Sequence, residues 1–171
     1  NAHTFGLQTL SDYYDHYEGR FPKNTLLEYD FAPHHVHVEG IPITGKLDKI
    51  EILSEVDKTA HVVDYKTGNP DGKSAELRPG GDYHRQIVFY QLLCDHSKDF
   101  AYTMKSGEID FVQKSKKEDG FVKELIHVSE EDKAALLETI KDTYEDIMSL
   151  RFLEPDEFAL CGDCEYCQLF K

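Results

Sequence analysis

The sequence lacks any long hydrophobic run. None of its 171 residues belongs to a stretch approaching the roughly 18 consecutive apolar residues of a membrane-spanning helix. A charged and then apolar leader is also missing from its start, so neither membrane insertion nor secretion is indicated and we expect a cytoplasmic protein. Internal repeats and low-complexity segments are absent too. We therefore expect residues 1–171 to form one domain with its own hydrophobic core.

Positive charge is scarce. The chain has 19 Lys and Arg against 33 Asp and Glu, a formal net charge of −14. Proteins that bind nucleic acid usually present a basic patch that displaces counterions from the phosphates, so this balance argues against nucleic-acid binding. Two arrangements would reconcile it with such a partner. Bound cations can offset carboxylates in a catalytic site, and a neighbouring domain can supply the basic surface.

Cysteine is also rare, with four in the chain, three of them in the tail at residues 151–171. In a cytoplasmic chain, the close spacing of Cys161, Cys164 and Cys167 favours a metal site over disulfides, and thiolates suit iron–sulfur clusters or zinc. The fourth, Cys94, falls in an apolar segment where a cysteine is typically a small buried hydrophobe. The chain thus offers three thiolates for a site that normally needs four.

Hydrophobic periodicity predicts several helices and strands. A helix is expected over residues 5–17, with one apolar face formed by Leu7, Leu10, Tyr14 and Tyr17. Short β-rich segments bounded by turn residues predict strands at 26–31, 35–38, 43–53, 60–66, 109–113 and 121–128. This order of elements predicts an α/β fold, a mixed central sheet flanked by helices.

Two further helices are expected after the strand at 60–66. A Gly-, Pro- and charge-rich loop at 68–81 follows that strand, and long loops within compact domains are often functional. Asp82 is placed to cap a largely buried helix over 83–95. Ser129 begins a capping-box-like Ser-Glu-Glu-Asp segment, which predicts another helix with an apolar stripe.

Two aspartates and a lysine are expected to converge at the end of neighbouring strands. Because side chains alternate along a strand, Asp64 and Lys66 point to the same side while Tyr65 points away. Asp48 lies in the preceding strand, and a hairpin would bring it beside Asp64. Its apolar neighbours make a lone charge costly there unless a cation or partner compensates it. An exposed Asp–Lys pair on a strand is also a common surface feature, so spacing alone leaves both interpretations open.

Such a trio suits the hydrolysis of phosphodiesters. Carboxylate oxygens, with the Tyr65 carbonyl as a further ligand, would hold Mg²⁺ or Mn²⁺. The bound ion would polarise the phosphate and activate water, while Lys66 would align that water or stabilise developing charge.

Three segments together resemble a known family. They are Gly45-Lys-Leu-Asp48-Lys-Ile50, Val62-Val-Asp64-Tyr-Lys66-Thr-Gly68 and Gln86-Ile-Val-Phe-Tyr90. Their combination resembles the central motifs of RecB-like nucleases of the PD-(D/E)xK superfamily. The resemblance covers about residues 28–90 and implies a restriction-endonuclease-like core.

The resemblance also implies roles for individual residues. Asp48 and Asp64 would bind metal, Lys66 would assist catalysis, and Gln86 and Tyr90, which share a helix face, would line the site. Glu28 resembles an acidic position that precedes the hairpin, and a solvated strand-end carboxylate is the alternative. The family usually carries an upstream histidine motif, which neither His3 nor His16 matches. The cysteines at 161, 164 and 167 resemble a family tail that in some members holds an iron–sulfur cluster with an upstream cysteine.

The expected function is therefore that of a Mg²⁺-dependent deoxyribonuclease, an exonuclease rather than an endonuclease, that acts on DNA in recombination and repair. The resemblance implies that the chain is a C-terminal piece of a longer protein with UvrD/Rep-type helicase domains. No membrane partner and no small-molecule substrate are expected. Two alternatives remain: an inactive PD-(D/E)xK scaffold or DNA-binding module, and a thiolate metal-binding domain. A scaffold has no need for the costly cluster of Asp48, Asp64 and Lys66.

Overall fold

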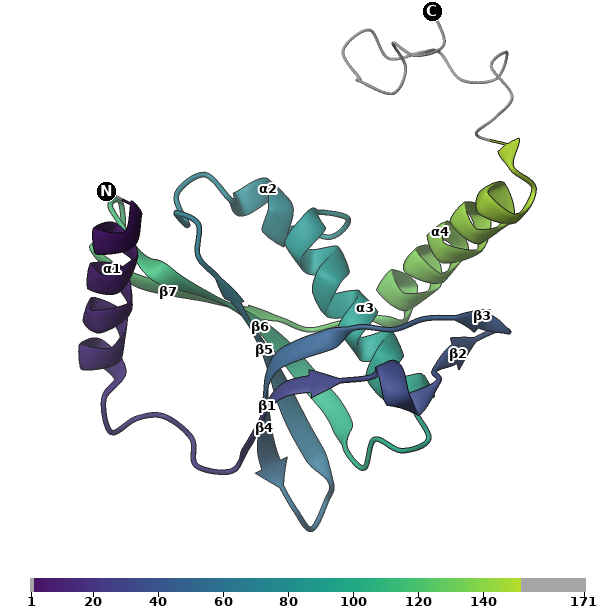
Figure 1. Ribbon diagram of the computed structural model, residues 1–171, viewed down its shortest axis with the longest axis horizontal. Helices are drawn as coiled ribbons and strands as arrows, with labels where there is room; N and C mark the ends of the chain where they lie inside the picture. Colours follow the sequence, from purple (N-terminus) through teal and green to yellow (C-terminus); the bar gives the residue numbers. More distant parts are fainter. Residues whose placement is uncertain (1, 152–171) are drawn as a thin grey trace, which may run out of the picture. The chain divides into compact units, whose positions relative to one another are not determined.

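The computed structural model describes residues 2–151, and one mixed β-sheet lies at their centre (Figure 1). The strand order is β1-β4-β5-β6-β7, and the pairing of β5 with β6 is parallel while the other three pairings are antiparallel. These strands are β1 (Thr25–Asp30), β4 (Lys46–Ser54), β5 (Thr59–Lys66), β6 (Thr103–Ser115) and β7 (Gly120–Ile126). A separate two-stranded ribbon pairs β2 (His37–Val38) with β3 (Ile41–Pro42).

Helices lie on both faces of the sheet. The helix α3 (Asp82–His96) forms the crossover that a parallel pair such as β5 and β6 requires. It packs so closely on β6 that a Cβ at Gly107 would lie 2.3 Å from Ile87 Cγ2. The helix α1 (Ala2–Tyr17) lies on the opposite face, where Tyr13 contacts Asp110. The predicted α/β class, a mixed sheet flanked by helices, is confirmed.

The remaining elements are short or follow the sheet. A 3₁₀ turn (Ala32–His34) follows β1, and α2 (Ser74–Leu77) interrupts the loop that leads to α3. The last helix, α4 (Glu130–Met148), begins as its sequence predicts, because the Ser129 hydroxyl accepts a hydrogen bond from Asp132 N–H while Asp132 Oδ2 accepts one from Ser129 N–H. The described residues form two compact units that divide after Leu136.

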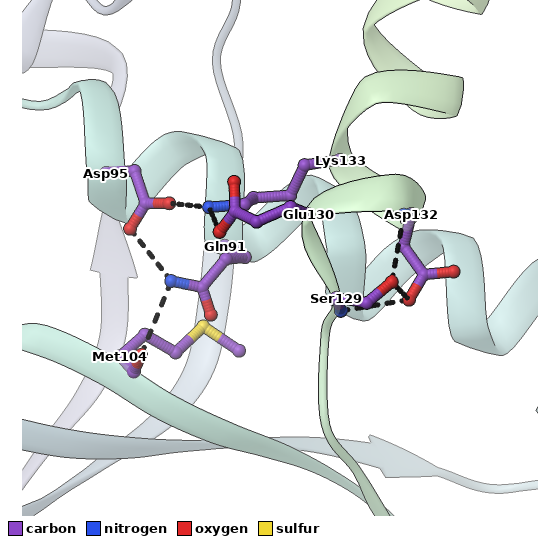
Figure 2. A network of polar contacts seen from close by, with 7 residues as sticks. All are labelled: Gln91, Asp95, Met104, Ser129, Glu130, Asp132 and Lys133. Carbon is purple, nitrogen blue, oxygen red and sulfur yellow. Dashed lines mark hydrogen bonds and ion pairs between the residues drawn. The ribbon is translucent and has the colours of Figure 1, made fainter.

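A polar network ties the first turn of α4 to α3 (Figure 2). Lys133 Nζ lies 3.2 Å from Asp95 Oδ2 and 2.7 Å from Glu130 Oε1. The other carboxylate oxygen of Asp95 accepts a hydrogen bond from Gln91, which also donates to the Met104 carbonyl at the start of β6. These bonds link α3, β6 and the beginning of α4 at the end of α3 that is remote from Asp82.

Three details differ from the sequence-based expectations. The predicted apolar face of α1 is wrong, because Leu7, Leu10 and Tyr14 are more than half exposed and Tyr13 is the buried residue of that helix. Asp82 is not the cap of α3 either. The N-cap is Gly81 and makes no side-chain capping bond, while Asp82 pairs with Arg85. Finally, β6 and β7 are longer or displaced relative to the predicted strands at 109–113 and 121–128.

Tyr13 draws α1 onto the sheet through a buried polar contact. Its hydroxyl donates to Asp110 Oδ2 at 2.5 Å, and Lys123 Nζ lies 2.6 Å from the same oxygen. Tyr13 is 7% exposed and Asp110 is fully buried. Asp110 of β6, rather than the apolar pattern of α1 itself, therefore determines that Tyr13 is buried.

The burial of Tyr13 predicts a loss of stability at alkaline pH. Burial, followed by the hydrogen bond to Asp110, raises the pKa of Tyr13 far above its ordinary value. In the unfolded chain its hydroxyl ionises near pH 10, while the folded protein keeps the proton. The stabilisation is thus complete below pH 10 and decreases above it by about 1.4 kcal/mol per pH unit. In Tyr13→Phe, the free energy of unfolding measured with denaturant should therefore fall less steeply with pH above 10, by about 1.4 kcal/mol per pH unit. An equally steep fall in Tyr13→Phe and in the unchanged protein would contradict the assignment.

Candidate active site

The β4–β5 hairpin brings Asp48 and Asp64 side by side. Lys49 pairs with Val63 and Ile50 with Val62, and a continuation of this register by one residue puts Asp48 opposite Asp64. Residues opposite each other on antiparallel strands point to the same side of the sheet. Asp48 Oδ2 accepts a hydrogen bond from Tyr65 N–H at 2.9 Å, which ties its carboxylate to the strand carrying the second aspartate.

Asp64 is a buried carboxylate surrounded by donors, and only 3% of it is exposed. Its Oδ1 accepts hydrogen bonds from Gln86 Nε2 and from the Tyr90 hydroxyl, each at 2.8 Å. Its Oδ2 forms an ion pair with Lys66 Nζ at 2.6 Å and has no hydrogen-bond partner within residues 2–151. One oxygen is thus fixed in direction and the other faces a single cation.

Lys66 is oriented by three neighbours. Besides Asp64, its ammonium donates to Gln86 Oε1 at 2.6 Å and lies 4.9 Å from the centre of the Tyr83 ring. Gln86 therefore bridges the pair: its amide nitrogen donates to Asp64 and its amide oxygen accepts from Lys66. The same nitrogen lies 2.7 Å from the Tyr90 hydroxyl. This places the lysine ammonium at one defined position beside the carboxylate.

Tyr90 acts as a neutral donor to Asp64. Burial is the main reason that its pKa is raised, and the negative charge of Asp64 adds to it. The hydroxyl consequently keeps its proton at neutral pH and holds Asp64 Oδ1. Its position one turn after Gln86 on α3 follows from the helical spacing of four residues.

Glu28 and the nearby histidines lie elsewhere. Glu28, in β1, is two-thirds exposed at its side chain and pairs with Lys46 at 2.5 Å. His34 contacts Ser97 and Tyr29, while His16 packs against Tyr17 and Phe121. The part of the chain described here therefore shows no direct contact between these three residues and Asp64. Cys161, Cys164 and Cys167 lie outside the described residues, and Cys94 is a buried free cysteine of α3.

Asp48 and Asp64 suit a metal site with few protein ligands better than one with three or more acidic, histidine or cysteine side chains. Within residues 2–151, no group of three or more His, Cys, Asp and Glu side chains is arranged to hold an ion. Asp48 and Asp64 supply two carboxylates, and Asp64 Oδ2 lacks a hydrogen-bond donor despite its burial. Mg²⁺ is commonly held by one or two carboxylates with water and substrate oxygens as its other ligands. The two aspartates fit that coordination.

A hollow of about 520 Å³ adjoins this cluster on the α3 side. Gln86 and Tyr90 form part of its wall, together with half-buried Phe89. Lys46 and Arg85 line it as well, although each is paired with an acid, Glu28 and Asp82 respectively. The sequence does not predict this hollow, because its residues come from β4, α3 and α4 and only the packing of these elements brings them together.

A mixed sheet with acids and a lysine at the ends of two neighbouring strands, and a crossover helix above them, defines a restriction-endonuclease-like domain. The profile of the PD-(D/E)XK nuclease superfamily matches residues 7–169, and the chain belongs to this superfamily. Membership points to nuclease chemistry. The RecB-like subtype is a finer assignment that stays with the resemblance described above.

Comparison with solved structures agrees with the fold. The crystal structure of SSO0001 superposes with a TM-score of 0.51 at 18% identity, over 87% of this chain and 61% of that one. At this identity the likeness concerns the fold alone. The chain thus spans less than two thirds of the length of SSO0001. Among curated proteins, none matches the chain.

Proposed function

We propose that this protein is a metal-dependent DNA nuclease whose site is built on Asp48, Asp64 and Lys66. The observation that carries the proposal is the environment of Asp64. The Asp64 side chain is 3% exposed. Its Oδ1 accepts two hydrogen bonds, while its Oδ2 forms an ion pair with Lys66 and accepts no hydrogen bond within residues 2–151. Burying a charge in this way is costly, and such costs concentrate at functional sites.

Each residue has a distinct task in this proposal. Asp48, Asp64 and the Tyr65 carbonyl hold Mg²⁺ or Mn²⁺, which supplies Lewis-acid polarisation of the phosphate and activation of water. Gln86 and Tyr90 fix the direction of the Asp64 carboxylate. Lys66 places its ammonium where negative charge develops on the phosphate as water adds and one P–O ester bond breaks. The products are a phosphomonoester and a free hydroxyl.

The wider setting is also part of the proposal. The RecB-like motifs support an exonuclease that serves DNA recombination or repair as a module joined to UvrD/Rep-type helicase domains. Such a partner would supply the basic surface that a chain with a net charge of −14 has in short supply. No helix within the described residues is long and apolar enough to span a membrane. An iron–sulfur cluster on the three tail cysteines would need a fourth ligand.

The proposal predicts a strict dependence of DNA cleavage on particular cations. Degradation of labelled DNA at low salt should proceed with Mg²⁺ or Mn²⁺ and stop when a chelator is added. Calcium should bind yet support little turnover, because its looser coordination positions water poorly. Asp64→Ala, purified in the same way and assayed with Mg²⁺, is the matched control for contaminating nuclease. Cleavage that continues in chelator would exclude this mechanism, and an inactive scaffold would show no cleavage with any of the ions.

A further inference from the structure

A second lysine lies close to Lys66. Lys73 belongs to the Gly-, Pro- and charge-rich loop that follows β5, outside the three segments that resemble the nuclease family. Its ammonium lies 5.9 Å from the centre of the Tyr83 ring, which the Lys66 ammonium approaches at 4.9 Å. The two cations therefore share one aromatic neighbour, and Lys73 lies beside the candidate active site.

Packing against the sheet holds the Tyr83 ring in place. Tyr83 lies in the first turn of α3, and its ring meets that of Phe111 at 62° with the ring centres 5.9 Å apart. Such tilted, edge-on contacts are favourable for aromatic pairs. Phe111 is fully buried in β6, where it pairs with Lys66 in the parallel register of β5 and β6. The ring that both lysines approach is thus anchored to the strand next to Lys66.

The loop that carries Lys73 is held on both sides of this residue. Before it, Asp71 accepts hydrogen bonds from the Ser115 hydroxyl at 2.6 Å and from Lys116 N–H at 3.1 Å, which join the loop to the β6–β7 hairpin. After it, α2 packs so closely on Gly81 that a Cβ there would lie 2.4 Å from a backbone oxygen of α2. The ammonium of Lys73 is therefore presented from a fixed backbone.

Glu76 is the acid that pairs with Lys73. The lysine Nζ donates to Glu76 Oε1 at 3.0 Å, and the two side chains are 35% and 32% exposed. The hydrogen bond to Glu76, followed by the nearby Tyr83, raises the pKa of Lys73, so its side chain is a cation at neutral pH. Glu76 Oε2 is buried without a hydrogen-bond partner within residues 2–151, which costs free energy. Because partly exposed ion pairs contribute little to stability, an incoming anion can replace Glu76 at Lys73.

The charge of a DNA strand provides a role for such a cation. Each phosphate carries one negative charge. In the proposed mechanism Lys66 serves the phosphate that is cut, and it is already engaged with Asp64 and Gln86. The next phosphate along the strand would otherwise meet a protein with a net charge of −14. Lys73 shares a ring with Lys66, so it lies where a successive phosphate of the same strand can reach it.

We propose that Lys73 binds the phosphate next to the one that is cut, and that this phosphate replaces Glu76 when DNA binds. The inference rests on the proposed nuclease function and adds a substrate-positioning residue to it. The Tyr83 ring sets the separation between Lys66 and Lys73. Holding the neighbouring phosphate at that separation aligns the cut phosphate with Asp64 and Lys66, while Glu76 neutralises Lys73 in the absence of DNA.

Substitutions at Lys73 and Glu76 should change DNA binding in opposite directions. The probe is a fluorescein-labelled duplex with single-stranded tails, with Ca²⁺ in place of Mg²⁺ to suppress cleavage. Lys73→Gln should weaken binding at low salt, and its plot of log affinity against log salt should be shallower by roughly 0.7–0.9, the contribution of one phosphate contact. Glu76→Gln should strengthen binding, because Lys73 is then unpaired. The double variant Lys73→Gln/Glu76→Gln should lose this gain.

The turn of the β4–β5 hairpin provides a matched pair of controls. Lys58 pairs with Glu55 at 3.0 Å and lies 5.2 Å from the centre of the Tyr102 ring, at the end of the hairpin remote from Asp64. Lys58→Gln and Glu55→Gln make the same changes in net charge and should leave the salt dependence unaltered. Equal effects of the two lysine variants, or of the two glutamate variants, would overturn the proposal.

A substrate with a single phosphate tests which phosphate Lys73 contacts. Bis(4-nitrophenyl) phosphate contains one phosphodiester and no neighbouring phosphate. Lys73→Gln should lower kcat/KM for DNA by about 5-fold, as for the loss of one exposed ion pair, and leave kcat/KM for bis(4-nitrophenyl) phosphate unchanged. Lys66→Ala should lower both. An equal fall on both substrates in Lys73→Gln would show that Lys73 does not act through a neighbouring phosphate and would overturn the proposal.

The ring is tested by two substitutions of Tyr83. Tyr83→Phe keeps the ring and should retain kcat/KM for DNA. Tyr83→Leu removes the neighbour that both lysines approach and should lower kcat/KM for DNA by about 5-fold, within the range for loss of a cation–π contact. Its effect on bis(4-nitrophenyl) phosphate should be smaller, because that substrate depends on Lys66 and not on Lys73. Equal kcat/KM for DNA in the two variants would show that the ring does not position the lysines.

The Lys73 proposal and the nuclease proposal fail in different ways. If both substrates are hydrolysed with Mg²⁺ but Lys73→Gln behaves as Lys58→Gln does, the Lys73 proposal is wrong and the nuclease stands. If no ion supports hydrolysis while Lys73→Gln still lowers the salt dependence of DNA binding, the nuclease proposal is wrong and Lys73 is a phosphate contact of a non-catalytic module. Loss of both effects overturns both.

Discussion

Replacing Asp64 with alanine is expected to abolish metal-dependent DNA cleavage and to weaken binding of the catalytic ion. The carboxylate is the most buried acid of the cluster and one of the two that the proposal assigns to the ion, so its removal takes away half of the carboxylate ligands. Calorimetric titration with Mn²⁺ and a cleavage assay measure the two effects separately. Asp57→Ala is the matched control, because it removes an exposed aspartate from the turn of the same β4–β5 hairpin.

Lys66→Ala is expected to separate rate from ion binding. It should retain Mn²⁺ affinity while kcat falls by about 10²–10³-fold, the effect of removing one group that stabilises transition-state charge. The lysine acts mainly once charge develops, so KM should change much less than kcat. If Asp64→Ala cleaves DNA as fast as Asp57→Ala, the cluster takes no part in cleavage. A normal kcat in Lys66→Ala would show that the lysine does not assist catalysis.

Gly107→Val is expected to cost the fold about 3 kcal/mol, the upper end for forcing extra atoms into a packed interior. Gly107 lies on β6 beneath α3, where even a single Cβ would be 2.3 Å from Ile87 Cγ2 and 3.0 Å from Ile87 Cδ1. Neither the sheet nor α3 can move freely at this point, since Gly107 pairs with both β5 and β7. Chemical denaturation of the purified variant measures the free energy of unfolding.

A double-mutant cycle identifies the cause of that loss. Gly107→Ala and Ile87→Ala should each destabilise the protein, the first by crowding and the second by leaving a cavity. Together they should cost less than the sum of the single effects, because the new methyl fills space that Ile87 vacates. Strict additivity would show that crowding against Ile87 is not the reason glycine is needed here. Gly68→Ala, at a glycine with no atom within 4 Å, is the control for loss of backbone freedom.

The alternation of residues along strands predicts part of the candidate site from the sequence. It places Asp64 and Lys66 on one side, and the length of the hairpin places Asp48 opposite Asp64, which agrees with the observed pairing of the adjacent residues Lys49 and Val63. The contacts of Gln86 and Tyr90 with Asp64 need more than periodicity. Their shared helix face is predictable, but which way that face turns depends on α3 packing against β6, and only the family resemblance indicated it.

The buried face of α1 could not be predicted from its own sequence. Leu7, Leu10 and Tyr14 form the more regular apolar stripe, yet Tyr13 is buried because Asp110 offers a buried acceptor 97 residues further along the chain. Local patterns measure hydrophobicity along one helix and contain no information on such a partner. The cap of α3 escaped prediction for a similar reason. Gly81 stands so close to the α2 carbonyls that a Cβ there would lie 2.4 Å from Ala75 O, which makes this position one for glycine.

The parallel pairing of β5 with β6 sets an order in which the candidate site can be assembled during folding. Asp48, Asp64 and Lys66 belong to a hairpin whose strands are separated by four residues, a local structure that forms in microseconds. Gln86 and Tyr90 reach Asp64 only when α3 has crossed over and β6 has paired, which are slower, long-range events. Until then the Asp64 carboxylate stays hydrated. A divalent cation present during refolding can therefore bind the two aspartates before α3 covers them. We expect it to accelerate the late phase of refolding, in which α3 and β6 pack, rather than the early formation of the hairpin.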